Sequence, residues 1–307
     1  MRKVPEFHAN GKLLITGEYL VLVGATALAL PVRFGQKLQA EESGSNLVEW
    51  ESASPSGVWF KGTFDPETFR IVSIDKMELA GKLRELLLAA RTLNPGFLKG
   101  QGGFSVRTHA DYPPEWGLGS SSTLCWLVAA WAGVNPYDLH GLVSNGSGYD
   151  IACAGRSEIL YFRRRDGKPE VTSASAGRAL REYTYFVYLG KKQDSTREVH
   201  HFLANLNPTE KEVEQVSSLA SRICLTDSFD ELYYLIEEHE SLISTVLKRE
   251  PIARRFPSFP GTAKSLGAWG GDFAMFASGN ERGEVLDILR DMGFPVVFTY
   301  NEIKAAS

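Results

Sequence analysis

The sequence predicts an α+β protein, because strand-like and helix-like segments are interleaved along its 307 residues without a regular β-α-β repeat. Residues 38–69 alternate polar and apolar side chains, which is typical of antiparallel strands with one face in water. Residues 74–93 carry apolar side chains at the helical period, and the Asn-Pro-Gly sequence that follows ends this helix. A hydrophobic share of 43% is enough for a buried core and argues against disorder.

The other elements of the first half are predicted from apolar runs and glycine breaks. Residues 12–32 are expected to form a strand, a turn and a second strand, with Gly17 and Gly24 in the turn region. The remaining elements are a strand at 104–108, a buried helix at 120–131 that Gly133 ends, and helical segments at 137–143 and 150–154.

The second half continues with strands and amphipathic helices. Ser228 and Glu231 have the spacing of a capping box at the start of one helix. The polar stretch 163–178 is the best candidate for a domain joint, so we expect two domains, 1–170 and 171–307. The predicted elements are strands at 183–189, 273–276 and 295–300, and helices at 210–223, 229–247 and 284–292.

Composition and charge exclude several classes of protein. A formal net charge of -4 argues against a nucleic-acid partner. The three cysteines are scattered and form no CxxC pair, which indicates a reducing compartment. The longest apolar run, 20–32, is shorter than the ~20 residues that span a bilayer, and no signal-peptide pattern is found. We therefore expect a soluble cytoplasmic protein without a membrane partner, either a monomer or a homodimer.

The sharpest motif is PPEWGLGSSST at residues 113–123, which directly precedes and enters a predicted helix. Glycines allow a backbone to curl around an anion, and the free N–H groups at a helix start favour negative charge. Serine hydroxyls can bind phosphate oxygens or magnesium. The motif therefore predicts a phosphate-binding turn, although it matches neither GxxxxGK[ST] nor GxGxxG. The alternative is an ordinary Gly-Ser helix cap.

Two further motifs carry a cation and a carboxylate. In NGKLLITGEY, residues 10–19, Lys12 could balance charge on a transferring phosphoryl group, or it could be a lysine that only reaches to the surface beside a strand. In NGSGYDIA, residues 145–152, Asp150 could accept a proton from a substrate hydroxyl, or it could cap a helix. Neither motif alone decides between these alternatives.

Two loops in the second half are candidates for contact with a ligand. GAWGGDF, residues 267–273, allows close approach to its backbone, with Asp272 as a polar contact, or it is a tight hairpin. KKQDSTR, residues 191–197, combines three cations with Ser195 and Thr196 near a predicted helix start, which would suit a second anion. The alternative for this loop is a solvated charged turn. The six histidines show no metal spacing and are expected to be core or surface residues.

The order of these five motifs resembles the GHMP kinase superfamily (galactokinase, homoserine kinase, mevalonate kinase and phosphomevalonate kinase). Within it, GEY, GSGYD and GGD are most similar to the pattern of phosphomevalonate kinases. The resemblance runs from Asn10 to about Phe276. It implies a two-lobed fold, with a left-handed β-α-β element in an N-terminal ATP-binding lobe (1–170) and a ferredoxin-like C-terminal lobe (171–307). ATP and Mg²⁺ would be the cofactors, and ATP would lie between the lobes.

The resemblance also implies a role for individual residues. Asp150 would be the catalytic aspartate, and Lys12 would steady it and the moving phosphoryl group. Ser121 matches the serine that contacts magnesium. The ATP phosphates would be bound by Gly117, Leu118, Gly119, Ser120, Ser121 and Ser122. The substrate would be bound by Glu18, Tyr19, Ser147, Ser195, Thr196, Arg197, Gly270, Gly271 and Asp272.

The implied activity is phosphoryl transfer from Mg-ATP to a small anionic acceptor such as mevalonate or phosphomevalonate. The alternatives are a sugar or homoserine-type kinase, a diphosphomevalonate-type decarboxylase, and a non-catalytic nucleotide-binding protein. Three features depart from the family pattern. Trp269 replaces a glycine, Ser122 and Thr123 replace alanines, and only Asp138 and His140 stand near the place of a magnesium-binding glutamate.

Overall fold

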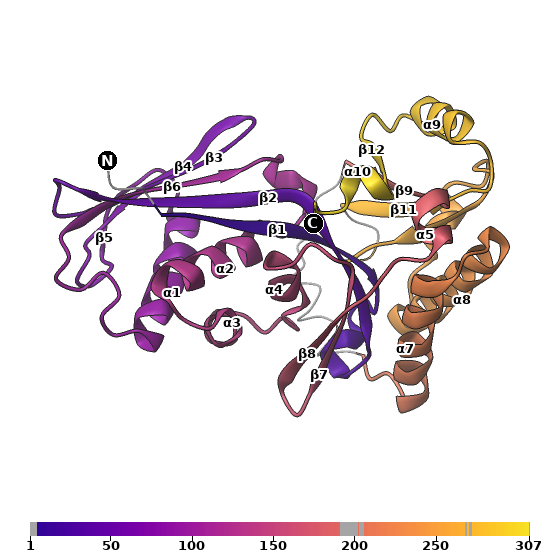
Figure 1. The fold of residues 1–307 in the computed structure, drawn as a ribbon, viewed down its shortest axis with the longest axis horizontal. Helices are drawn as coiled ribbons and strands as arrows, with labels where there is room; N and C mark the ends of the chain where they lie inside the picture. The colour runs from indigo at the N-terminus through magenta and orange to yellow at the C-terminus, as the bar shows by residue number, and fades with distance from the viewer. Residues whose placement is uncertain (1–4, 191–201, 203–205, 268, 270–271, 307) are drawn as a thin grey trace. The chain divides into compact units, whose positions relative to one another are not determined.

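The computed structural model describes all residues except 1–4, 191–201, 203–205, 268, 270–271 and 307 (Figure 1). The chain forms two compact units that are discontinuous in sequence. Unit 1 comprises residues 1–11, 34–114 and 118–155, and unit 2 comprises residues 12–33, 115–117 and 156–307. Both units contain helices and strands, which confirms the predicted α+β class. The domain boundary at residue 170 stays a prediction.

Two long strands contribute to both units, β1 (Glu6–Thr16) and β2 (Ala27–Ser43). They pair with each other. The first part of β2 pairs in unit 2 with β7 (Leu160–Arg165), and its later part pairs in unit 1 with β6 (Gly103–Ala110). The β1–β2 connection contains a 3-10 turn, η1 (Leu20–Val23). This turn ends at Gly24, whose backbone has a left-handed conformation.

The sheet in unit 1 has the strand order β5-β4-β3-β6-β2, formed by β3 (Val48–Ser54), β4 (Gly57–Phe64) and β5 (Ile71–Ile74) with β6 and β2. β3 pairs antiparallel with β4 but parallel with β6. The expectation of antiparallel pairing in this region is therefore only partly correct. The physical reason is that α1 (Met77–Leu93) joins β5 to β6 and provides the long crossover that a parallel pair needs.

Helices cover one side of these strands, as Figure 1 shows. Besides α1 they are α2 (Ser120–Ala132), α3 (Pro136–Val143) and α4 (Tyr149–Ala154), and a short turn, η2 (Pro114–Trp116), precedes α2. Apolar side chains from the strands, among them Leu38 and Val106, pack with Leu87, Leu127 and Val128 of the helices in one buried cluster. This core fixes α2 and α4, whose starts carry two of the predicted motifs.

Unit 2 contains a four-stranded antiparallel sheet in the order β10-β11-β9-β12. Its strands are β9 (Thr184–Tyr188), β10 (Thr262–Ser265), β11 (Phe273–Ala277) and β12 (Val297–Thr299). The helices α7 (Glu210–Leu225) and α8 (Phe229–Leu247) pack together, and α8 also packs on β10 (Figure 1). The other elements are β8 (Lys168–Ser173), α5 (Arg178–Tyr183), η3 (Ile252–Arg255), α9 (Arg282–Asp291) and α10 (Tyr300–Ile303).

One local prediction needs correction. The amide of Glu231 donates to Ser228 Oγ as predicted, but the Glu231 carboxylate accepts from Thr226 Oγ1 at 2.6 Å, so only half of the capping box forms. The polar stretch 163–178 contains most of the β7–β8 hairpin, with its arginines and lysine on exposed positions, and its role as a domain joint stays a prediction. None of the described helices is both long and apolar enough to cross a membrane.

Candidate active site

The predicted phosphate-binding turn lies at the start of α2, where Gly119 is the N-cap residue with φ 95°. This left-handed conformation favours glycine. Thr123 N–H donates to the Gly119 carbonyl at 2.9 Å, so the amides before Thr123 have no carbonyl partner within the helix. Ser121 is exposed in this first turn, whereas Leu118 is fully buried and anchors it. The turn therefore offers backbone donors and the positive end of a helix dipole to an anion.

The two hydroxyls that depart from the family pattern hold this turn in place. Ser122 Oγ donates to the Gly119 carbonyl at 2.8 Å. Thr123 Oγ1 is buried, and its acceptors include Gln36 Oε1 on β2 at 2.9 Å and the Gly119 carbonyl at 3.2 Å. Both hydroxyls thus stabilise the turn from inside unit 1.

Asp150 is the second residue of α4, which begins after Gly148 (φ 91°). The side chain is half-buried, and its Oδ1 accepts from the Ile151 amide at 3.0 Å. Burial raises the pKa of the Cys125 thiol on α2 to about 12, with a smaller contribution from the Asp150 carboxylate. The packing of α2 on α4 thus places the Asp150 carboxylate near enough to Cys125, in the middle of α2, to act on its thiol within unit 1.

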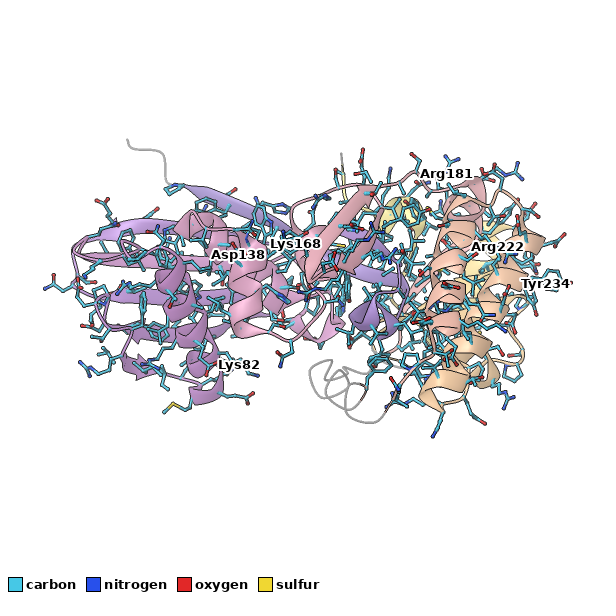
Figure 2. All side chains as sticks on the ribbon, turned by 90° about the horizontal axis from the view of Figure 1, so that it is seen from below. Lys82, Asp138, Lys168, Arg181, Arg222 and Tyr234 are labelled. Atoms are coloured by element: carbon cyan, nitrogen blue, oxygen red, sulfur yellow. The ribbon has the colours of Figure 1, made fainter. Side chains whose placement is uncertain are left out.

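Ser147 and the surrounding turn are also placed within unit 1. The Ser147 hydroxyl is buried and accepts from the Tyr149 amide at 3.4 Å, so it shapes the turn before α4. His140 on α3 is buried, whereas Asp138 on the same helix is exposed (Figure 2). Within the described parts of the chain, no group of three or more His, Cys, Asp or Glu side chains is arranged to hold a metal ion.

Unit 2 brings Lys12, Gly117 and Asp272 together. Lys12 Nζ donates to the Gly117 carbonyl at 3.1 Å, across 105 residues of sequence. Gly117 has φ 68°, and a Cβ built on it would overlap the Asp272 carboxylate. The backbone of Gly117 therefore has an ammonium at its carbonyl and a carboxylate against its Cα, and no other residue type fits there without displacing Asp272.

The segment before Gly117 is held by aromatic side chains of the four-stranded sheet. The Trp116 ring lies 6.0 Å from Tyr188, 6.1 Å from Phe273 and 5.7 Å from Phe298, measured between centroids. Tyr188 Oη donates to the Glu115 carbonyl at 3.3 Å. Sequence reasoning missed this support, because the three partners come from three separate strands.

Glu18 and Tyr19 are both buried in unit 2. The Glu18 carboxylate accepts a hydrogen bond from Lys264 Nζ on β10, so it is engaged in an internal ion pair. Tyr19 Oη accepts from the Trp269 amide at 3.3 Å. The predicted contact of these two residues with substrate stays a prediction. Sequence reasoning missed Lys264, since a single lysine in a short strand gives no signal.

Five of the predicted substrate-binding residues lie outside the described residues. They are Ser195, Thr196, Arg197, Gly270 and Gly271. Among the predicted residues that the structure describes, unit 1 holds Ser120, Ser121, Ser122, Ser147 and Asp150, and unit 2 holds Lys12, Glu18, Tyr19, Gly117 and Asp272.

Solved structures share this fold over nearly the whole chain. Phosphomevalonate kinase from Streptococcus pneumoniae, in complex with phosphomevalonate and AMPPNP, has a TM-score of 0.72 at 16% identity, covering 96% of this chain and 99% of its own. Mevalonate kinase from Methanococcus jannaschii has a TM-score of 0.66 at 13% identity, covering 100% and 99%. Lactococcus lactis galactokinase, complexed with galactose, has a TM-score of 0.64 at 14% identity, covering 100% and 94%.

The chain therefore has the α+β, two-lobed fold of the GHMP kinases, which confirms the fold that the motif order predicts. No family model matches the sequence, and no curated protein matches it. At identities of 13% to 16%, the likeness defines the fold and leaves the phosphoryl acceptor open.

Proposed function

We propose that this protein is an ATP-dependent phosphotransferase whose acceptor is a small anion such as mevalonate or phosphomevalonate. The observation that carries the proposal is the glycine-serine turn at the start of α2, whose first amides have no carbonyl partner within the helix, in a chain that shares its fold with kinases over 96% or more of its length. The S. pneumoniae phosphomevalonate kinase with this fold was solved with the ATP analogue AMPPNP.

Unit 1 would bind the nucleotide phosphates. The amides of residues 119–122 and the dipole of α2 favour a polyanion, and the Ser120 and Ser121 hydroxyls add donors. Mg²⁺ bound with ATP would neutralise part of the phosphate charge. The exposed Ser121 hydroxyl would supply a hard oxygen ligand of the kind that Mg²⁺ prefers.

Two side chains would act on the transferring group. Asp150 orients the acceptor and takes the proton of an acceptor hydroxyl. Lys12, whose ammonium also binds the Gly117 carbonyl, offsets the negative charge that develops in transfer. If the acceptor is a phosphate monoester, its oxygen is largely ionised near pH 7 (second pKa of ~6), and Asp150 then serves mainly to position it. Asp272 would contact the substrate or phosphate beside Gly117.

The anionic nature of the acceptor is supported by the sequence of the loop 191–197. Its two lysines and Arg197, with Ser195 and Thr196, would bind a carboxylate or phosphate, and Ser147, Gly270 and Gly271 would complete the contacts. A hydroxyl-bearing sugar is the second candidate, because a galactokinase solved with galactose has the same fold.

Two departures from the family pattern support the non-catalytic alternative, the absent magnesium-binding glutamate and Trp269, which replaces a glycine. Its side chain is only 5% exposed, and its indole Nε1 donates to the Glu250 carbonyl at 3.2 Å within unit 2. The bulk of the tryptophan is therefore accommodated in the core of this unit. The bulk of Trp269 therefore gives no support to the non-catalytic alternative.

The test is magnesium-dependent consumption of ATP with a panel of acceptors. The panel contains mevalonate, phosphomevalonate, diphosphomevalonate, galactose and homoserine, with carbon dioxide release measured in parallel. We expect turnover with mevalonate or phosphomevalonate. Turnover only with galactose or homoserine would contradict the anionic acceptor, and carbon dioxide release would indicate a decarboxylase. ATP binding without turnover on any acceptor would overturn the enzymatic proposal.

We further propose a cytoplasmic location and a monomeric or homodimeric state. All three cysteines are buried as free thiols, which suits a reducing compartment. Light scattering of the purified protein measures the oligomeric state directly, and a mass above two chains would contradict this part of the proposal.

A further inference from the structure

Four ionisable side chains form a buried cluster in unit 2. Glu18 follows β1, Lys264 lies on β10, and His239 and Glu240 lie on α8. None of these residues is more than 1% exposed. Lys264 Nζ donates to Glu18 Oε1 and, at 2.8 Å, to the Ser265 carbonyl. The second Glu18 oxygen lies 3.5 Å from His239 Nε2, and Glu240 Oε1 lies 4.0 Å from Lys264 Nζ. The cluster thus joins three separate elements around one ammonium.

Burial of these charged side chains costs desolvation free energy, so the cluster adds little net stability to the core. A buried ion pair is often no more stabilising than apolar side chains of the same volume, because the desolvation of both charges offsets their attraction. Burial raises the pKa of Glu18 despite Lys264, raises the pKa of Glu240 to about 8, and lowers the pKa of His239 well below its usual value. Net stability therefore does not account for the cluster. Its hydrogen bonds do have a further effect, because they fix the position of Glu18 relative to Lys264.

The contacts of Glu18 and of the next residue reach the same stretch of chain. Glu18 is bonded to Lys264, and Tyr19 Oη accepts from the amide of Trp269, five residues after Lys264. The turn itself is closely packed, because a Cβ built on Gly17 (φ 89°) would lie 2.8 Å from the Ala27 Cα. A rigid turn therefore has two attachment points on the segment that leads from β10 to Asp272.

The Trp269 side chain provides a third attachment. Its indole donates to the Glu250 carbonyl, and its ring packs in a buried cluster with Tyr19, Leu20 and Phe202. The Tyr19 ring stacks on Phe202 with centroids 5.3 Å apart. The backbone at Trp269, three residues before Asp272, is thus fixed by both its amide and its side chain.

These contacts close a ring within unit 2. From Trp269 the chain continues to Asp272, whose carboxylate lies against the Gly117 Cα. The Gly117 carbonyl binds Lys12, and β1 leads from Lys12 back to the turn at Glu18 and Tyr19.

We infer that the Glu18–Lys264 pair and the Tyr19–Trp269 contact form a positioning device that holds Asp272 and Lys12 in place next to Gly117. Lys264, Tyr19 and Trp269 are then positioning residues for the reaction, and they do not touch the reacting atoms. This inference rests on the proposed kinase function. It also assigns a purpose to the tryptophan that replaces the glycine of the family pattern.

The test uses the full-length double variant Glu18→Gln/Lys264→Met, which removes both charges of this pair together, so that neither partner is left charged without the other. Tyr19→Phe, which removes the acceptor of the Trp269 amide and keeps the ring, is the second variant. The control is Arg222→Met/Glu238→Gln, which removes an exposed pair 3.5 Å apart on α7 and α8; Arg222 is labelled in Figure 2. Thermal unfolding, kcat, KM for ATP and hydrogen–deuterium exchange of the Trp269 amide are measured for each protein.

We expect kcat to fall ~10-fold or more in the double variant and ~3-fold in Tyr19→Phe, with KM for ATP within ~3-fold of the parent. Exchange at Trp269 should accelerate at least ~10-fold in both variants, with unfolding temperatures near that of the parent and an unchanged control. Parental kcat with accelerated exchange would overturn the positioning role, and parental exchange would overturn the anchoring contacts. If the unmodified protein transfers no phosphoryl group while exchange accelerates, the proposed function fails and the anchoring contacts stand.

Discussion

The two units differ in the kind of polar group that they offer to a ligand. In unit 1 the first turn of α2 offers main-chain amides, and glycine at position 119 makes their orientation possible. In unit 2 the corresponding features are side-chain charges, Lys12 and Asp272, both next to Gly117. Recognition by amides depends on backbone conformation, whereas charge balance depends on single side chains. Substitutions that change the backbone conformation and substitutions that remove a single charge should therefore have different effects on activity.

The largest expected effect concerns the side chain of unit 1 that the proposal places at the acceptor. Asp150→Asn should lower kcat ~100-fold or more with a hydroxyl acceptor, because the amide cannot take the proton. Binding of a non-hydrolysable ATP analogue should stay near normal, as measured by calorimetry. Asp230→Asn, at the exposed second position of α8, is the matched control, since Asp150 is likewise the second residue of its helix. Undiminished turnover in Asp150→Asn would remove this residue from the mechanism.

The next prediction separates backbone strain from displacement of a neighbour. Gly117 and Gly133 have nearly the same conformation, φ 68° and 66°, but only Gly117 has a neighbour, Asp272, within 4 Å of an added Cβ. Alanine at either position should cost about 1–2 kcal/mol in unfolding free energy, because an L residue is strained there. Only Gly117→Ala should also lower kcat, by ~10-fold or more.

Urea unfolding and steady-state kinetics of the two alanine variants provide the measurement. Equal kcat values would show that the Asp272 position beside Gly117 has no part in turnover. A loss of activity in Gly133→Ala alone would contradict the assignment of the site to the other end of α2.

The smallest expected effect concerns the buried cluster and pH. The pKa of Glu240 is about 8 in the folded protein and 4.5 in a solvated chain, so the folded state binds more protons between these values. Its contribution to stability is therefore lost as pH rises from about 5 to 8. Glu18 changes the pH dependence of stability in the same direction, because burial raises its pKa despite Lys264. His239 has the opposite effect at lower pH, because burial lowers its pKa.

Glu240→Gln cannot titrate, so its unfolding free energy should fall less steeply across this pH range than that of the parent. Urea titrations at pH 5, 6, 7 and 8 measure the two slopes. Because the amide also changes the hydrogen bonds to Ile252 and Ser265, the slope and not the absolute stability is compared. Identical slopes would contradict the raised pKa of Glu240.

Local signals in the sequence were sufficient for the fold class and for the elements that carry the motifs. The helix predicted at 120–131 is Ser120–Ala132 in the structure, because Gly119 and Gly133 both adopt left-handed conformations at its ends. Apolar periodicity likewise placed α1, which begins three residues later than predicted. These features depend on residues close in sequence, and this is why they could be predicted.

Contacts between distant residues could not be predicted in the same way. The approach of Lys12 to Gly117 joins residues 105 apart, and the Glu18–Lys264 pair joins residues 246 apart. Neither contact leaves a periodic or compositional pattern. The parallel pairing of β3 with β6 was missed for the same reason, since it depends on where the crossover through α1 returns the chain.

The most direct test of the account measures ATP binding and phosphoryl transfer separately in Lys12→Met. The account predicts that calorimetric affinity for a non-hydrolysable ATP analogue stays within ~3-fold of the parent while single-turnover transfer slows ~100-fold or more. Binding and transfer that weaken in equal proportion would contradict the division between nucleotide binding in unit 1 and charge compensation in unit 2, and so would unchanged transfer.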